Sequence, residues 1–202
     1  MSAESKADSS SEPRIDTGFR PLPWVLLASI LGITTIYLRH TGRRWWCKFG
    51  RPIPWWGGVN DGHTSQHLTD PYSFSHVLHG LLFYALLRPL AGRLRWEVRL
   101  VLAITLECLW EMAENSTWVI ERYRRSTMAL GYEGDSVLNS LGDIACCGIG
   151  FLLAWRLPVR WSIALFLAVE VGMLVAYRDN LLLNVIMLLY PFDGLKTWQM
   201  GG

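Results

Sequence analysis

The sequence predicts an all-α integral membrane protein, a bundle of about five spanning helices followed by a short C-terminal hydrophobic helix. Hydrophobic residues make up 51% of the 202 residues, whereas charged residues make up 18%. A soluble domain usually carries about a quarter charged residues. The apolar residues gather in runs of about 17 or more, which is long enough to cross a bilayer as a helix. The runs lack the ten-residue alternation of outer-membrane barrel strands.

The chain begins with a polar segment, residues 1–19, which is rich in Ser, Asp, Glu and Lys. We predict a disordered tail there and a multi-pass transmembrane domain over residues 20–202. The first apolar run covers residues 21–38. Arg39, Arg43 and Arg44 follow it in place of a small-residue cleavage site, which favours an uncleaved anchor over a signal peptide.

A loop over residues 39–72 is rich in Arg, Gly, Pro and Trp, and its paired Trp residues fit an interfacial aromatic belt. Four further spans are predicted after it. The run at 181–192 is too short to span, so we expect a short, re-entrant or interfacial helix. The four predicted spans are residues 74–91, 98–120, 136–155 and 161–177.

Polar residues interrupt three of these runs at helical spacing. In the second run His76 and His79 are three apart, so they share a helix face. The third and fourth runs each carry a set of acidic or amide side chains on one side of the helix. These sets are Glu107, Glu111 and Glu114 in the third, and Asp135, Asn139 and Asp143 in the fourth.

An ionisable residue at the centre of a spanning helix costs roughly 2.5–3.5 kcal/mol on the insertion scale. Glu107 and Glu111 lie well inside the third run, so they should face the bundle interior and find partners there. Three interpretations remain open. The polar centre could be a metal or acid/base site, a pathway or cavity for an ion, proton or headgroup, or interhelical bonding that only fixes packing.

The first interpretation assigns roles to each residue. His76, His79 and Glu111 are the predicted ligands of a divalent metal such as zinc or iron. Glu107 or Glu114 is the predicted general base, because burial moves the pKa of a carboxyl group toward neutrality. The remaining catalytic candidates, Asp135, Asn139 and Asp143, come from the fourth run, where the two aspartates would support the ligands or add to them.

Other features are weaker. A net charge of +2 argues against a nucleic-acid partner. No cysteine has metal-ligand spacing, so we expect the thiols to be small packing residues. His63 and His67 are four apart, but the H-E-x-x-H pattern is missing, and we expect a solvated or interfacial loop rather than a metal site.

Several motifs together resemble a family of uncharacterised multi-pass membrane proteins from Gram-negative bacteria. The resemblance runs from about Thr41 to the C-terminus. It implies a protein of the inner (plasma) membrane, in contact with membrane lipids, and it implies no activity. The motifs are SQH (65–67), SHVLHG (75–80), WEMAENS (110–116), GDSVLNS (134–140) and RDNLLLN (178–184).

A more distant pattern is similar to VanZ-like membrane proteins, with His76, Glu111, Asp135 and Asn139 in the corresponding places. The function we predict is metal-assisted chemistry inside the membrane, on a lipid or cell-envelope precursor. The alternative is a non-enzymatic transport, binding or assembly protein whose polar core is structural or conducts an ion.

Overall fold

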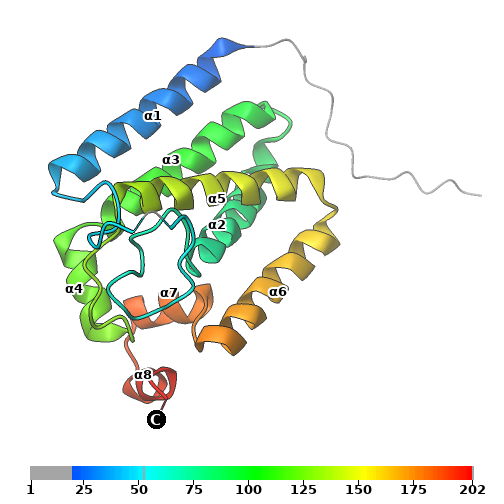
Figure 1. Cartoon of the computed structure of the whole chain (residues 1–202). Helices are drawn as coiled ribbons and strands as arrows, with labels where there is room; N and C mark the ends of the chain where they lie inside the picture. The colour runs from blue at the N-terminus through cyan, green and yellow to red at the C-terminus, as the bar shows by residue number, and fades with distance from the viewer. Residues whose placement is uncertain (1–19, 52, 202) are drawn as a thin grey trace, which may run out of the picture.

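The computed structural model describes residues 20–51 and 53–201. The predicted tail, residues 1–19, lies outside this part. The described chain is all-α, as predicted (Figure 1). Eight α-helices and one 3-10 turn follow one another in the described residues. They are α1 (Pro21–His40), α2 (Ser73–Leu87), η1 (Arg88–Leu90), α3 (Trp96–Glu114), α4 (Thr117–Ser126), α5 (Val137–Arg156), α6 (Val159–Tyr177), α7 (Leu181–Leu189) and α8 (Asp193–Gln199).

Three of these helices, α1, α5 and α6, are long and apolar enough to cross a membrane. Helices α1 and α6 are largely uncovered by protein. Only 17% of the apolar stretch of α1 and 11% of that of α6 is buried. Exposed apolar side chains such as Ile36 and Val175 coat them. A surface of this kind suits lipid rather than water. Five spans stay a prediction, because α2 and α3 differ from the runs expected there.

The second run was expected to reach Ala91, but α2 ends at Leu87. A 3-10 turn begins at Arg88, and Pro89 within it has no backbone N–H to continue an α-helix. Fifteen residues give a helix of about 22 Å, which is shorter than the ~30 Å hydrocarbon core.

The third run was expected to continue to Ile120, but α3 ends at Glu114. Ser116 starts a new helix, since its hydroxyl accepts a hydrogen bond from the backbone N–H of Val119. The C-terminal run is a short helix as predicted, although α7 ends at Leu189. The polar helix α8 after it was not predicted.

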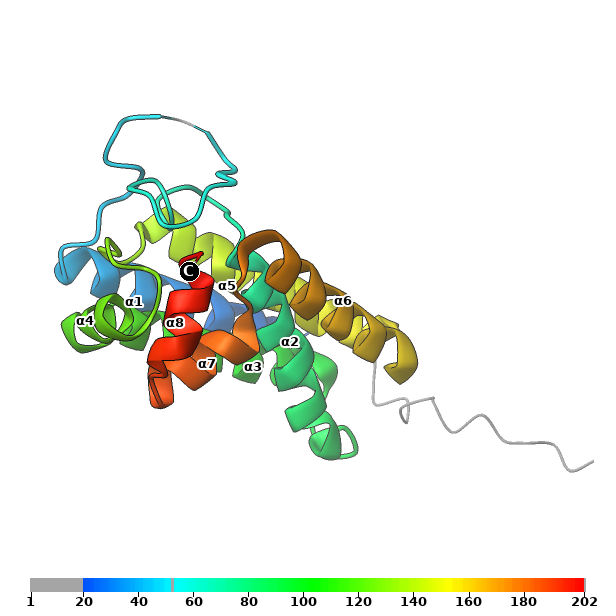
Figure 2. The same cartoon turned by 90° about the horizontal axis from the view of Figure 1, so that it is seen from below.

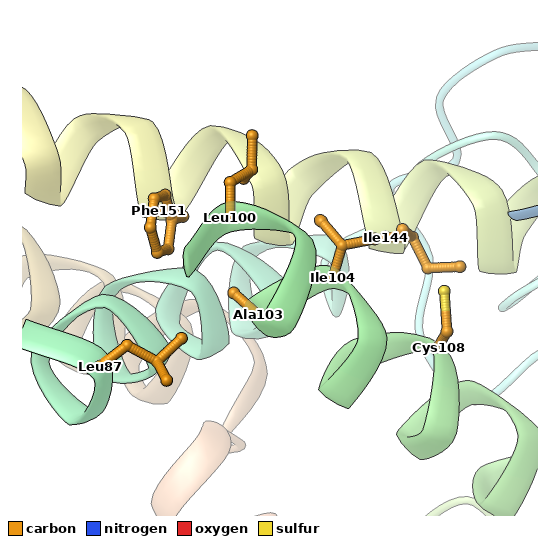
Figure 3. Packing of buried hydrophobic residues seen from close by; sticks show 7 residues of the cluster. All are labelled: Leu87, Leu100, Ala103, Ile104, Cys108, Ile144 and Phe151. Carbon is orange, nitrogen blue, oxygen red and sulfur yellow. The ribbon is translucent and has the colours of Figure 1, made fainter. Parts of the chain in front are cut away.

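The packing centre lies where α2 crosses α5. Gly80 of α2 lies against the backbone of Cys147 and Phe151, and Gly150 of α5 lies against the carbonyl of Val77, so a side chain at either glycine would clash. Small residues let two helix backbones approach closely in this way. The apolar cluster beside the crossing joins α2, α3 and α5 (Figure 3). It contains Leu87, Leu100, Ala103, Ile104, Cys108, Ile144 and Phe151.

The long loop between α1 and α2, described over residues 41–51 and 53–72, lies on one side of the helices (Figure 2). It is anchored to the start of α5, where the backbone N–H of Ser136 donates to the carbonyl of Ser65 at 2.9 Å. The N–H of Val137 donates to the carbonyl of Arg44 at 2.7 Å. These bonds hold the loop over the polar ends of α2, α3 and α5.

Candidate functional site

Most of the predicted polar residues of the bundle come together at this end of the helices. α2 supplies both histidines, α3 the three glutamates, and the start of α5 the remaining aspartate and amide groups. Glu107 and Glu111 have no exposed surface, and Asp143 is also buried. The structure therefore brings seven of the eight predicted residues to one cluster and its cavity: His76, His79, Glu107, Glu111, Glu114, Asp135 and Asp143. The eighth, Asn139, is buried on α5.

Glu107 binds both histidines. Its Oε1 lies 2.5 Å from Nδ1 of His76, and its Oε2 lies 3.0 Å from Nδ1 of His79. Because a carboxylate only accepts, each imidazole must donate its Nδ1 proton to Glu107. The Nε2 atom of each ring is then the basic nitrogen. Glu107 thus fixes the tautomer and orientation of both rings.

Glu111 lies one helical turn further along α3 and is fully buried. Neither of its carboxylate oxygens has a hydrogen-bond partner. Nδ1 of His76 lies 3.5 Å from its Oε1. Buried polar atoms normally find partners, so two bare carboxylate oxygens in the interior point to a missing ligand. Asn139, also buried, leaves both side-chain atoms without a hydrogen bond.

Asp143 approaches the same histidine from α5. Its Oδ2 lies 3.8 Å from Nε2 of His76, while its Oδ1 accepts from the Ser73 hydroxyl at 2.5 Å. Ser73 opens α2, and its hydroxyl also accepts from the backbone N–H of Asp70 at 3.1 Å. Asp143 is thereby held in place between α2 and the preceding loop.

Asp135 lies just before α5 and is bonded to two residues from other segments. Asn115 donates to its Oδ2 at 2.8 Å, and the hydroxyl of Tyr132 donates to its Oδ1 at 2.8 Å. Burial raises the pKa of Asp135, although the bonds from Tyr132 and Asn115 oppose that rise. Asp135 is thus a buried acid whose position is fixed by two hydrogen bonds, and it lies at the edge of the cluster.

Two supporting residues were missed from the sequence. Asp70 accepts the backbone N–H groups of Ser65 and Tyr72 at 2.7 and 2.8 Å and so shapes the entry into α2. Burial raises its pKa to about 6. The signal that could have found it is the Asp-Pro pair before Ser73, which is typical of a turn leading into a helix. Nothing in the sequence marks Tyr132 as a partner of Asp135.

A cavity of about 560 Å³ opens beside the cluster. His76, His79, Glu114, Asp135 and Asp143 reach its wall. One part of the wall is apolar and comes from α2, α3 and α7. Another part is polar and comes from the loops. The apolar set includes Phe83, Leu106, Leu109, Trp110, Val185 and Leu188, and the polar set includes Lys48, Asn60, Asp61 and Thr64.

Two triads in this cluster have donor atoms close enough together to hold a metal ion. His76 with His79 and Glu107 forms one, and His76 with Glu111 and Glu114 forms the other. Within each triad the donor atoms lie within 4.8 Å of one another. Among the described residues no such triad pairs His79 with Glu111, so the predicted set of three ligands is divided between two groups that share His76.

This chain is similar in sequence to known proteins over most of its length. A UPF0314 protein of Rhizobium meliloti is 44% identical over 88% of this chain and 91% of its own length. A UPF0314 protein of Paracoccus denitrificans is 42% identical over 93% of this chain and 97% of its own length. No solved structure matches. The family described as "Protein of unknown function (DUF2585)" matches residues 38–201. The chain therefore belongs to the DUF2585/UPF0314 family, which is uncharacterised and found in alphaproteobacteria.

Proposed function

We propose that the protein is a metal-assisted enzyme of the inner membrane that acts on an amphiphilic substrate, a lipid or cell-envelope precursor. The observation that carries the proposal is Glu111, a fully buried carboxylate with two oxygens that no hydrogen bond satisfies. Leaving a charge in that condition costs several kcal/mol. A divalent cation between Glu111 and its neighbours removes the cost.

The donors around Glu111 suit such an ion. His76 and Glu114 lie within 4.8 Å of it, and a His plus carboxylate set is a common ligand set for zinc or iron. Carboxylates also outnumber imidazoles in the cluster, so a cation balances the charge. Glu107 is the weaker ligand candidate, because its oxygens already accept from two imidazoles. It acts instead as the group that orients His76.

His79 is the proposed proton carrier. It is 16% exposed, lines the cavity, and has its Nδ1 held by Glu107, so Nε2 is the nitrogen that takes up or releases a proton. A base oriented by a buried carboxylate is the arrangement general acid–base catalysis uses. A bound metal would supply Lewis-acid polarisation of a carbonyl or phosphoryl oxygen.

The cavity walls support an amphiphilic substrate. Leu106, Leu109 and Trp110 offer an apolar surface from α3, and the loop offers Lys48, Asn60 and Thr64. An acyl chain fits the first surface and a polar headgroup the second. The exposed helices α1 and α6, each long and apolar enough to cross a membrane, support a membrane location, where such a substrate would be found. The similarity to VanZ-like proteins stays a prediction.

Elemental analysis of the purified full-length protein tests the metal. We expect Glu111→Gln to lose one equivalent that the wild type holds. Glu121→Gln, an exposed glutamate on α4, is the matched control and should lose none. A folded wild type without metal, or metal unaffected by Glu111→Gln, overturns this site.

Incubation with a total lipid extract of an alphaproteobacterium tests the activity. Metal-loaded wild type should convert a lipid species, detected by mass spectrometry, and His79→Ala should convert it at least about a hundredfold more slowly. A protein that holds the metal and leaves every lipid unchanged overturns the enzyme proposal in favour of a transport, binding or assembly role.

A further inference from the structure

We propose that Cys47, His63 and His67 form a second metal site, in the loop between α1 and α2, and that it binds a zinc ion. This site is separate from the bundle cluster and does not rest on the proposed function. The three donor atoms lie within 4.8 Å of one another. His63 and His67 alone were expected to be loop residues. The thiol of Cys47 is the partner that the sequence did not associate with them.

The distances fit a single ion. Nδ1 of His63 lies 3.2 Å from Nε2 of His67 and 3.3 Å from Sγ of Cys47. Two imidazole nitrogens at about 2.0–2.1 Å from a tetrahedral zinc ion are about 3.3 Å apart, and a thiolate sulfur at about 2.3 Å is slightly further from each. Closing onto zinc therefore needs only small side-chain movements.

The protons available to Cys47, His63 and His67 are too few for a complete hydrogen-bond network, which favours a bound cation. Nδ1 of His67 lies 2.6 Å from the carbonyl oxygen of Ile53 and must donate to it, which leaves a lone pair on Nε2. That lone pair and the Cys47 sulfur both face Nδ1 of His63. One Nδ1 proton satisfies one of them at most. A metal ion accepts electron pairs from all three.

The surroundings resemble those of a built site. His67 has no exposed surface, and Cys47 is 5% exposed. Trp56 stacks on His63 and His67 with ring centroids at 4.3 and 5.5 Å, and Phe49 covers His63 at 4.4 Å. The bond from His67 to a backbone carbonyl is the usual device that orients a ligating imidazole.

Binding releases protons and orders the loop. The Cys47 thiol loses its proton to solvent, the sulfur becomes a thiolate ligand, and His63 coordinates through a deprotonated Nδ1. Three protein ligands leave a fourth position for water. The ion joins residues 47 and 67, between which lie Asn60, Asp61 and Thr64 of the cavity wall. Zinc would therefore fix the loop that forms the polar side of the cavity.

Cobalt(II) substitution tests the site in the full-length, metal-stripped protein. We expect the wild type to show a thiolate-to-cobalt charge-transfer band, and Cys47→Ser to abolish it. Cys146→Ser, a half-buried thiol on α5, is the matched control and keeps the band. Zinc should displace cobalt in the wild type.

The histidines are tested by zinc titration. His63→Ala and His67→Ala should each weaken zinc binding at this site at least about tenfold, while His40→Ala, an exposed histidine at the end of α1, leaves it unchanged. Glu111→Gln must keep the cobalt band, which separates this site from the bundle cluster. A folded wild type without the band, or a band that survives Cys47→Ser, overturns the proposal.

Discussion

Nδ1 of His76 and Oε1 of Glu107 lie 2.5 Å apart in the interior, joining α2 to α3. The glutamate has no exposed surface. The same carboxylate holds His79, so one side chain positions both imidazoles of the cluster. A group with this many buried partners is expected to contribute to stability as well as to the geometry of the site.

Replacing this carboxylate should therefore destabilise the fold. We expect Glu107→Gln to lower the free energy of unfolding by about 3 kcal/mol, because it leaves two buried imidazoles without their charged partner. Thermal unfolding in detergent measures the loss. Glu121→Gln, which removes an exposed pair with Arg125, should change stability by less than about 1 kcal/mol. Equal effects of the two variants would contradict the interior role of Glu107.

The helix crossing gives a second prediction. Gly80→Ala should lower the free energy of unfolding by about 1–3 kcal/mol, because the new methyl group meets the backbone of α5 at Cys147. Gly172→Ala on α6 is the matched control. Nothing lies within 4 Å of a Cβ there, so alanine should be neutral or add up to about 1 kcal/mol. Thermal unfolding distinguishes them, and an unchanged midpoint for Gly80→Ala would rule out the close crossing.

Much of this site was predictable because helical spacing is local. Residues four apart share a face whatever the fold, so Glu107 and Glu111 could be placed together, and the cost of burying them required partners. The break at Ser116 was missed because a serine inside a run is ambiguous until its hydroxyl is seen to cap a helix.

The loop was not predictable, because its conformation depends on residues far along the chain. Ser65 is held by the backbone of Ser136, and Gln66 donates to the carbonyl of Gly134 at 2.9 Å. No sequence pattern relates positions so far apart, so the meeting of Cys47 with His63 could not be foreseen. Irregular segments have no period from which contacts can be inferred.

Asn115 and Asp135 exchange two hydrogen bonds that tie the end of α3 to the start of α5. The amide nitrogen donates to Oδ2 of Asp135 at 2.8 Å, and the amide oxygen accepts the backbone N–H of Asp135 at 2.8 Å. Asn115→Asp should lower the unfolding free energy by about 2–3 kcal/mol, because two carboxylates then face each other.

Exchanging the two side chains provides the control. The double variant Asn115→Asp with Asp135→Asn restores one donor and one acceptor, so it should be more stable than Asn115→Asp alone in thermal unfolding. If the double variant is no more stable than the single one, direct bonding between these residues is not what holds the two helices.

Asp70 gives a pH-dependent prediction. Burial raises its pKa to about 6 in the folded protein, so the folded state binds the proton more tightly than the unfolded state. Its contribution to stability therefore grows as pH falls from about 6 toward the ordinary value of 3.8, and it is lost as pH rises through 6. The total change is at most about 3 kcal/mol.

Asp70→Asn removes this titration, so the stability of the wild type relative to the variant should increase as the pH is lowered from 7 to 5. Thermal unfolding at several pH values measures the difference. The control is Asp193→Asn, which removes an exposed carboxyl group instead of a buried one. A constant difference for Asp70→Asn would show that the Asp70 carboxyl group ionises as it does in the unfolded chain.

Glu170 of α6 caps the start of α7. Its Oε1 accepts the backbone N–H of Leu181 at 3.0 Å, and its Oε2 accepts that of Leu182 at 3.2 Å. A helix leaves its first N–H groups unsatisfied, and a carboxylate there also meets the positive end of the helix dipole. This bonding explains why an acidic residue lies inside an otherwise apolar helix.

Glu170→Ala should therefore loosen α7, at a cost of about 1–2 kcal/mol. Because Leu181 and Asn184 of α7 line the cavity, a loosened α7 would also open one side of the site. Hydrogen exchange followed by mass spectrometry should show reduced protection in residues 181–189 and unchanged protection in α2. Glu170→Gln, which keeps one acceptor oxygen, should fall between the wild type and alanine. Protection of α7 that is the same in all three proteins would mean that the helix is held by its apolar contacts alone.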